Sequence, residues 1–430
     1  MPIKYFFAIP LLLAAGMSVA EADQKENPTA TTAKAGKTGA KKAPVSLAAS
    51  APAAAATMDG TSATAASAPP DATTPAAPGL PELPMFKFGG FGSLGVSHSS
   101  LNQGDYVIES SMPKGAGRSS NWTASNNTRA AVHMTAYFTP EVSAVCQIDS
   151  EYRSDGTYSP EIEWLNVKYA FTPNAYMRLG RIALPTFIDS ENHDVGYSYV
   201  WVNPPVDLYH QLPISSSDGV DFVYRSEIGE ASNSIKAIYG TSTHERPNSV
   251  STSKDMWGIF DTIEYGQALF HVSYQQRRES NRSLQTGVDG PWIRNSDLSV
   301  GASYDPGKWF VISEWVQRRS TTKISAMYVS GGYRIEKFTP YLLYSQNSPG
   351  SFYSTSTPPT AAAIERANRA QSTASLGVRW DFMRNYDFKF QYDQVKLSDN
   401  SNGYLENVPA GVTLYGSRFY VVSAVVDFVF

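Results

Sequence analysis

The sequence predicts an all-β protein, a transmembrane antiparallel β-barrel of about 16 strands with a disordered N-terminal tail. Three observations predict it. Apolar and polar residues alternate with a period of two from Phe86 onward, most alternating segments have ten to fourteen residues, and the connections between them are short and long in turn. Alternation places residues i and i+2 on one side of a sheet, and a tilted strand needs about 9–11 residues to cross a bilayer.

The first 84 residues are predicted to lie outside this fold. Residues 1–22 have a lysine near the start, an apolar run and then small residues, which is the pattern of a secretory signal peptide. Residues 23–84 are almost entirely Ala, Thr, Pro, Ser, Gly and Lys, so they cannot bury a core. We expect a disordered periplasmic tail that acts as a spacer. The alternative is a tether to anionic peptidoglycan through Lys34, Lys37, Lys41 and Lys42.

The predicted barrel covers residues 85–430. Sixteen strands fit the pattern best, although eighteen remain open. Their expected ranges are 86–97, 128–139, 141–152, 161–171, 174–184, 218–227, 231–241, 255–265, 267–278, 295–305, 307–319, 322–335, 337–347, 371–382, 385–397 and 417–430.

The connections decide between a soluble sandwich and a membrane barrel, because both show an apolar and a charged face. In residues 218–225, for example, Val220, Phe222 and Tyr224 oppose Asp221 and Arg225. Short turns at one end and long loops at the other are typical of outer-membrane barrels. The long loops are expected at 98–127, 153–160, 185–217, 242–254, 279–294, 348–370 and 398–416, and only the connection at 320–321 breaks the rule.

Aromatic residues near strand ends predict interfacial girdles. These residues are Tyr137, Phe138, Tyr152, Tyr169, Phe171, Tyr265, Trp309, Trp315, Tyr333, Tyr341 and Trp380. Every second residue of the last strand is apolar or aromatic, which predicts a lipid-facing row that closes the barrel against the first strand. The members of this row are Tyr420, Val422, Ala424, Val426, Phe428 and Phe430.

Other chemistry finds little support in the sequence. A net charge of -4 argues against nucleic-acid binding. The single cysteine, Cys146, is expected to face lipid, and the six histidines show no metal-ligand spacing on one element. No nucleophile–base motif occurs, so we expect no enzymatic activity, no metal and no cofactor; an outer-membrane hydrolase is a remote alternative.

Residues 178–225, together with the signal peptide, the strand count and the terminal Phe430, resemble the Gram-negative outer-membrane porin family. The resemblance implies a sixteen-stranded barrel, usually a homotrimer, that passes small hydrophilic solutes and ions by diffusion through the outer membrane. It also implies contact with lipid and lipopolysaccharide, and recognition of the final strand by the barrel-assembly machinery. The Ala/Pro-rich tail departs from the common porin plan.

With an even strand count both termini face the periplasm, so residues 185–217 form the third external loop. In porins this loop folds into the barrel and narrows the channel, and five aromatics favour that reading over an ordinary surface loop. Its acids are Asp189, Glu191, Asp194 and Asp207. Alternation predicts the inward-facing basic residues Arg129, Lys168, Arg178, Arg225 and Arg277.

Acidic loop residues opposite basic wall residues would give a transverse field, and the sequence leans weakly to anion preference. Two alternatives stay open. One is a solute-selective channel for phosphate or organic acids. The other is a barrel that serves mainly adhesion or cell-wall anchoring, which would use the tail and the loops at 98–127 and 348–370.

Overall fold

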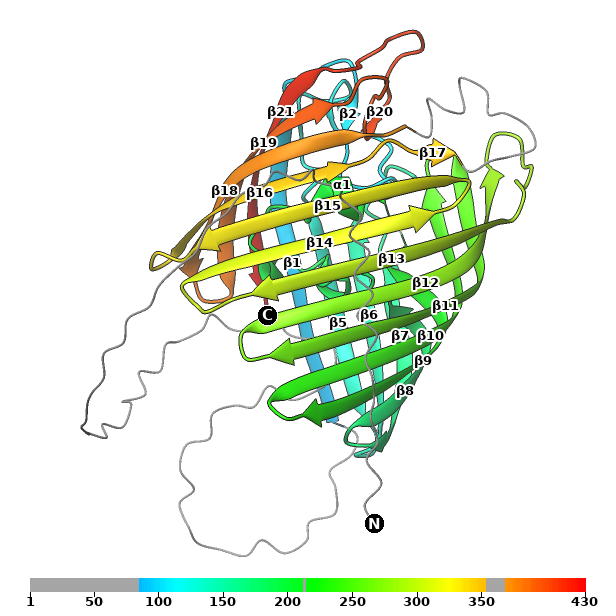
Figure 1. Cartoon of the computed structure of the whole chain (residues 1–430), viewed down its shortest axis with the longest axis vertical. Helices are drawn as coiled ribbons and strands as arrows, with labels where there is room; N and C mark the ends of the chain where they lie inside the picture. The colour runs from blue at the N-terminus through cyan, green and yellow to red at the C-terminus, as the bar shows by residue number, and fades with distance from the viewer. Residues whose placement is uncertain (1–84, 212–213, 353–367) are drawn as a thin grey trace, which may run out of the picture. The chain divides into compact units, whose positions relative to one another are not determined.

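A computed structural model describes residues 85–211, 214–352 and 368–430. The predicted signal peptide and tail lie outside these residues. Sixteen long antiparallel strands pair in sequence order, and the last pairs with the first, so the sheet closes into a barrel (Figure 1). This confirms the predicted fold class and strand count.

The strands and their bounds follow the alternating pattern closely. The barrel strands are β1 (Met85–Ser99), β5 (Arg129–Tyr137), β6 (Val142–Glu151), β7 (Glu161–Thr172), β8 (Ala175–Ala183), β9 (Ser216–Ile228), β10 (Ala231–Arg246), β11 (Ser249–Tyr265), β12 (Ala268–Ser283), β13 (Ile293–Tyr304), β14 (Trp309–Arg319), β15 (Thr322–Tyr333), β16 (Phe338–Asn347), β18 (Gln371–Met383), β19 (Tyr386–Leu397) and β21 (Arg418–Val429).

Short elements occupy the long connections. They are β2 (Asp105–Tyr106), β3 (Ala116–Gly117), β4 (Trp122–Thr123), β17 (Ser351–Phe352), β20 (Leu405–Glu406), the 3-10 helices η1 (Ser190–Asn192) and η2 (Gly196–Ser198), and the helix α1 (Val206–Tyr209). β2 pairs with β3 and with β20, so the connection after β1 and the connection before β21 fold together. None of the helices among the described residues is long and apolar enough to cross a membrane.

One predicted loop was wrong. Residues 242–254 continue β10 and β11, which join at residues 247–248, and β12 extends to Ser283. This part of the sequence is rich in Ser and Thr on both faces. Apolar alternation is required only where one face meets hydrocarbon, so strands that continue past the apolar band lose the signal while keeping their backbone pairing.

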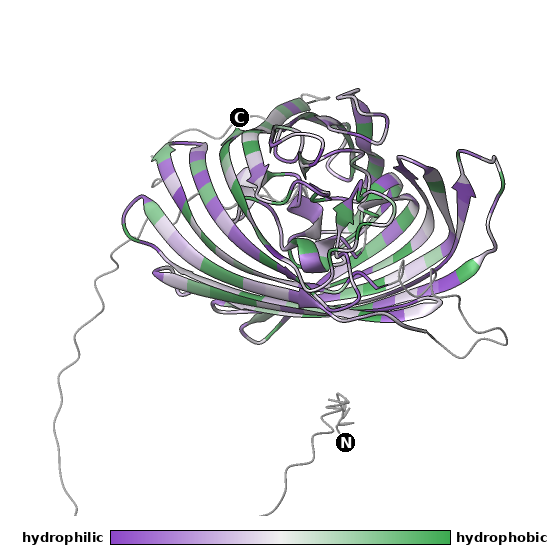
Figure 2. Cartoon of the chain, turned by 90° about the horizontal axis from the view of Figure 1, so that it is seen from above, coloured by the Kyte–Doolittle hydropathy of each residue, from purple (hydrophilic) through white to green (hydrophobic). Residues whose placement is uncertain are grey.

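Outward and inward faces follow the predicted alternation. Figure 2 shows apolar and polar bands alternating along the strands. Phe222 and Tyr224 are exposed on the outer face, whereas Asp221 and Val223, which alternate with them, are buried inside. Cys146 pairs with Met134 on the outward register. Tyr341, however, was wrongly placed in the aromatic girdle: it faces the interior and is 2% exposed.

The barrel interior contains a hydrophobic core, which the sequence pattern did not predict. Inward-facing Ile312, Val316 and Tyr328 of β14 and β15 pack with Trp201 and Leu208 from the connection between β8 and β9. A second apolar cluster joins the connection after β1 to the ends of β19 and β21 through Val107, Met112, Leu397 and Val421. One side of the barrel interior is therefore filled by packed loops.

Candidate functional site

The described part of the connection between β8 and β9, residues 184–211 and 214–215, lies inside the barrel and is called the inner loop. Figure 2 shows loops and a short helical turn within the ring of strands. The Ser273 hydroxyl of β12 donates to the Thr186 carbonyl at 2.8 Å. The Ile188 amide donates to the Glu314 carboxylate of β14 at 2.8 Å. These bonds hold the start of the loop against the wall.

Apolar packing fixes the middle of the inner loop. Trp201 is 2% exposed, and its ring meets Tyr328 of β15 edge-on at a centroid distance of 5.6 Å. The Trp201 indole also donates to Ser330 Oγ at 2.8 Å. A buried indole needs such a partner for its single N–H, and here the inward face of β15 supplies it.

Basic residues of β18 and β19 bind the backbone of the same loop. Arg379 donates to the Tyr197 carbonyl at 2.8 Å and to the Tyr199 carbonyl at 3.1 Å. Lys389 donates to the Gly196 carbonyl and lies 3.0 Å from the Asp427 carboxylate. The loop therefore blocks the lumen along β14 to β21, and free volume remains on the side of β5 to β11.

Two cavities of about 410 Å³ each lie on this open side. The outer chamber touches the strand ends nearest the long loops, including Glu151 and Arg181. The inner chamber touches the ends nearest the short turns, including Ser143 and Ser232. Residues 185–194 of the inner loop line both chambers from the lumen side, so this segment separates them.

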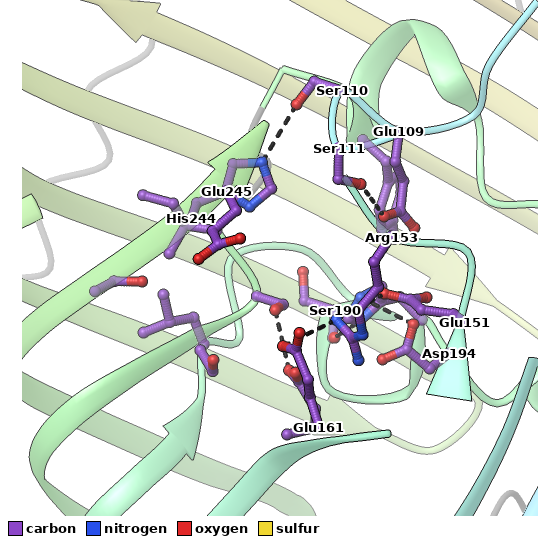
Figure 3. Close-up of a pocket in the computed structure, with 18 of the residues that line it drawn as sticks. Glu109, Ser110, Ser111, Glu151, Arg153, Glu161, Ser190, Asp194, His244 and Glu245 are labelled. Carbon is purple, nitrogen blue, oxygen red and sulfur yellow. Dashed lines mark hydrogen bonds and ion pairs between the residues drawn. The ribbon is translucent and has the colours of Figure 1, made fainter. Parts of the chain in front are cut away.

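Carboxylates outnumber guanidinium groups in the outer chamber. The acids are Glu109, Glu151, Glu161, Glu163, Asp194, Asp218 and Glu245, and the arginines are Arg129, Arg153 and Arg181. In Figure 3, Glu109, Glu151, Arg153 and Asp194 lie on one side of the chamber, with His244 and Glu245 on the other.

Glu109, Glu151 and Asp194 form a tight carboxylate cluster whose oxygens lie within 4.8 Å of one another. Two guanidinium groups offset its charge. Arg129 donates to Asp194 at 3.0 Å, and Arg153 lies 3.7 Å from Glu151. Because these acidic and basic groups pair directly with each other, they produce a weaker transverse field than separated acidic and basic walls would.

The inner chamber has the opposite charge character. The ring of Tyr176 lies 4.0 Å from Lys168 Nζ, 5.6 Å from the Arg225 guanidinium and 5.9 Å from the Arg178 guanidinium. These groups come from β7, β8 and β9, where the register places Lys168 opposite Arg178. Arg178 also pairs with Asp221 at 2.6 Å.

The sequence-predicted basic residues therefore separate into three environments. Arg129 lines the outer chamber, whereas Lys168, Arg178 and Arg225 line the inner one. Arg277 does neither. It is 2% exposed and bonds Asp297 and Glu279 within the wall of β12 and β13. The alternating pattern of β12 predicts an inward side chain for Arg277, but this pattern could not show that neighbouring side chains on the same sheet cover the guanidinium group.

The predicted loop acids also divide. Glu191 pairs with Lys236 and lies 3.8 Å from Arg178 in the inner chamber, and Asp194 lines the outer chamber. Asp207 is fully buried and accepts hydrogen bonds of 2.6 Å from Ser345 and from Gln371. Asp207 therefore anchors the loop to β16 and β18, and a passing solute does not reach it.

Burial changes the protonation of inner-loop groups. Loss of solvation raises the pKa of Asp189 to about 6. Burial disfavours the charged form of His193, but the carboxylates of Asp194, Glu109 and Glu163 outweigh this effect and raise the pKa of His193. Burial and nearby Arg369 lower the pKa of His210 to about 3.

The end of β21 closes the barrel. Gly90 and Phe430 exchange backbone hydrogen bonds of 3.0 Å, and Leu94 pairs with Val426. The side chains of the predicted row alternate with the buried Val421, Ser423, Val425 and Asp427. The row itself, Tyr420, Val422, Ala424, Val426, Phe428 and Phe430, therefore lies on the outer face.

Two parts of the site were missed by the sequence analysis. Tyr176 has an inward-facing ring among three cations. The sequence could have indicated this, because Tyr176 alternates with the outward-facing Met177 and therefore belongs to the inward face of β8. Glu109, Ser110 and Ser111 reach the outer chamber from the connection after β1. Nothing in a Gly/Ser-rich connection shows where it will fold, because its position depends on pairing with the distant residues of β20.

No family model and no curated protein sequence matches the chain. Several solved structures, however, are similar to it. An anion-selective porin from Comamonas acidovorans has a TM-score of 0.53 at 11% identity, covering 81% of this chain and 100% of that chain. The fold is that of the outer-membrane porins.

Two further structures share the porin fold. OmpT in trimer form, an outer membrane protein of Vibrio cholerae, has a TM-score of 0.52 at 14% identity and covers 81% of this chain and 99% of that chain. OmpF of Salmonella typhi in complex with daunomycin has a TM-score of 0.51 at 13% identity and covers 80% and 97%. The likeness extends over nearly the whole of each neighbour.

Proposed function

We propose that the protein is a water-filled channel in the outer membrane of a Gram-negative bacterium, through which small hydrophilic solutes and ions diffuse passively. The observation that carries this proposal is the pair of chambers between the inner loop and the wall of β5 to β11. Solutes would cross both chambers in series, and residues 185–194 would form the constriction between them.

Single-channel conductance in a planar bilayer tests the proposal. Refolded protein is expected to give stable, ohmic openings. Openings in groups of three would support the homotrimer that the porin fold suggests. A correctly folded barrel that never conducts would overturn the channel and would favour the adhesion or anchoring alternative.

Ion preference is a finer proposal. The charges of the two chambers favour ions of opposite sign. The anion preference expected from the sequence is supported by the inner chamber, with Lys168, Arg178, Arg225 and Lys236 against Glu191, Glu227 and Glu264. The outer chamber carries seven carboxylates against three arginines. We therefore propose a weak preference for anions, set by the cations around Tyr176, and the reversal potential under a salt gradient tests its sign.

The cations around Tyr176 also support the solute-selective alternative, in which phosphate or organic acids would pause in the inner chamber. Block of the chloride current by millimolar phosphate or succinate would favour selectivity over general diffusion. We further propose that the short turns face the periplasm, that the final strand is the signal for the assembly machinery, and that residues 23–84 form a periplasmic spacer, with contact to peptidoglycan as the alternative. We expect no catalytic activity.

A further inference from the structure

Three carboxylates of the outer chamber have no basic partner. Each arginine of the chamber already pairs with another acid at 2.8–3.3 Å, in the pairs Arg129–Asp194, Arg153–Glu161 and Arg181–Asp218. Across the described residues, no basic group lies within 4.0 Å of the remaining chamber carboxylates, those of Glu109, Glu163 and Glu245. Even when His193 is protonated, the chamber keeps an excess of negative charge that a cationic solute would offset.

Glu163 reaches the chamber because β7 contains a bulge. Ile162 and Trp164 pair with consecutive residues of β6, so Glu163 between them has no partner in the ladder. Leu165 faces outward and is 51% exposed, and uninterrupted alternation would turn Glu163 outward as well. A bulge redirects a side chain in this way. The Ser215 hydroxyl of the inner loop donates to the Glu163 carboxylate at 3.0 Å and holds it at the chamber wall.

Glu109 brings a second unpaired charge to the same chamber. Its carboxylate oxygens lie within 4.8 Å of those of Glu151 and Asp194. Arg129 and Arg153 offset two of these three charges. An ammonium group beside Glu109 would offset the third, and its N–H groups would donate charge-assisted hydrogen bonds to the carboxylates.

Two buried acceptor atoms of the inner loop also line this chamber. Asn203 is 9% exposed, and no described residue donates a hydrogen bond to its Oδ1 atom. His210 is likewise 9% exposed, and its Nδ1 atom has no partner among the described residues. Buried polar atoms destabilise a protein unless a partner reaches them. These two atoms therefore favour a ligand that carries N–H or O–H donors.

The Nδ1 atom of His210 accepts a hydrogen bond and does not donate one. Burial, and after it the charge of Arg369, lowers the pKa of His210 to about 3, so the ring is neutral at physiological pH. The other ring nitrogen bonds the Ile108 backbone carbonyl and therefore carries the proton. Arg246 and His244 also lower the pKa of His210. This end of the chamber consequently suits an uncharged donor, such as a hydroxyl group, and disfavours a second cation.

The outer chamber also offers apolar ring surface and room for a small molecule. Phe187 and Tyr209 of the inner loop line it, and their ring centroids lie 4.7 Å apart. The chamber volume of about 410 Å³ falls within the range of roughly 300–1,000 Å³ that is typical of small-molecule sites. A carbon skeleton of the size of one sugar ring fits there.

We propose that the outer chamber binds a hydroxylated organic ammonium ion of the amino-sugar class. The ammonium group bonds the carboxylates around Glu109 and Glu163, and the hydroxyl groups donate to Asn203 Oδ1 and His210 Nδ1. The proposal rests on the proposed channel, because the chamber forms part of the diffusion path. It adds a binding step, in which such a solute is held before it passes the constriction.

The test measures the binding of matched sugars to the refolded full-length protein by titration calorimetry in zwitterionic detergent. At about pH 6 glucosamine carries an ammonium group, whereas N-acetylglucosamine has a neutral amide in its place and glucose a hydroxyl. Glucosamine is expected to bind about tenfold more tightly than either neutral sugar. Equal binding of all three sugars, or no binding of glucosamine, would overturn the proposal. Equally tight binding of tetramethylammonium, which has no N–H or O–H donor, would also overturn it.

Variants locate the site. Glu109→Gln and Glu163→Gln are each expected to weaken glucosamine binding about tenfold, and Asn203→Leu roughly fivefold. Glu109→Gln lies in a connection and leaves the bulge of β7 intact, so it tests the site without altering a strand. The matched control is the double variant Glu141→Gln, Glu230→Gln, whose exposed acids lie near the short turns, and it should bind as the wild type does. Wild-type binding by all the chamber variants would refute the assignment.

A metal ion and the channel itself are tested separately. Calcium ions that displace glucosamine from the wild type at equal concentration would overturn the proposal in favour of a metal site at the cluster of Glu109, Glu151 and Asp194. A barrel that binds glucosamine with the expected variant profile but never conducts would refute the proposed channel and leave the binding site intact. A barrel that conducts but does not bind glucosamine would refute the binding site alone.

Discussion

The indole of Trp201 donates a hydrogen bond of 2.8 Å to Ser330 Oγ, 129 residues further along the chain. This bond joins the inner loop to the inward face of β15. Around it lie Leu208, Val316 and Tyr328, so the loop is fixed by a hydrophobic core in a position where a water-filled channel would otherwise continue. The width of the open path thus depends on packing on the opposite side of the loop.

Trp201→Ala is expected to loosen this packing and to increase single-channel conductance. Loss of a large buried ring costs about 3–5 kcal/mol in a core, so the docked loop becomes less stable and the lumen widens. Trp309→Ala is the matched control because Trp309 lies on the outer face and is 42% exposed. If both variants conduct as the wild type does, the core does not hold the constriction.

The pair of Arg129 and Asp194 is expected to control ion preference from the outer chamber. Their 3.0 Å contact leaves neither charge fully available to a passing ion. Asp194→Asn releases the guanidinium and should move the reversal potential toward anions, whereas Arg129→Gln should move it toward cations. The double variant should return close to the wild type, and Lys308→Gln at a short turn should have no effect. Shifts of the same sign in both single variants would contradict this account.

Acidification is expected to stabilise the docked loop through Asp189. Its pKa is raised to about 6 by burial, above the ordinary value of 3.8. A raised pKa in the folded state gives stability that is complete below about pH 4 and is lost as the pH rises through about 6. The unfolding temperature should therefore fall between pH 4 and pH 6, and Asp189→Asn should flatten this dependence. An unchanged pH profile in Asp189→Asn would assign the effect to another group.

Closure of the barrel is expected to fail when Gly90 gains a side chain. A Cβ there would overlap the Phe430 ring and lie 2.6 Å from the Ala131 carbonyl. Gly90→Ala should therefore lower the heat resistance of the folded barrel on gels. Gly331→Ala, where the nearest atom lies 3.2 Å away, is the control within another strand pair and should have a smaller effect. If both variants lost heat resistance equally, the loss would be a general effect of replacing a strand glycine and would not be specific to the closure between β1 and β21.

The sequence predicted the barrel because contact with lipid requires an apolar side chain at about every second position of each strand. Alternation of the kind seen at Asp221 and Phe222 is visible in a short window, so all sixteen strands were found. The site depended on contacts that no local rule encodes. Asp207 and Glu191 are both acids in one loop, yet one bonds Ser345 and Gln371 in the interior and the other pairs with Lys236 beside a chamber.

The same limit applies to Lys389, because its place in the alternation of β19 indicates an inward side chain but says nothing of the groups that surround it. Lys389 and Asp427 are 0% and 1% exposed, and 3.0 Å separates their charged atoms. The Ser93 hydroxyl also donates to Asp427. Together these groups join the seam strands β19, β21 and β1 to the inner loop. Such a buried pair is sensitive to loss of one member, because the remaining charge has no compensation.

Lys389→Met is therefore expected to destabilise the barrel by about 3–5 kcal/mol, measured as the free energy of unfolding in urea. The double variant Lys389→Met, Asp427→Leu should recover much of that loss, because apolar side chains of similar volume can replace a buried pair. Lys389→Met also removes the donor to the Gly196 carbonyl, so the double variant should restore stability while leaving the inner loop more mobile and the conductance raised. If the double variant is as unstable as Lys389→Met, the loop contact and not the ion pair carries the energy.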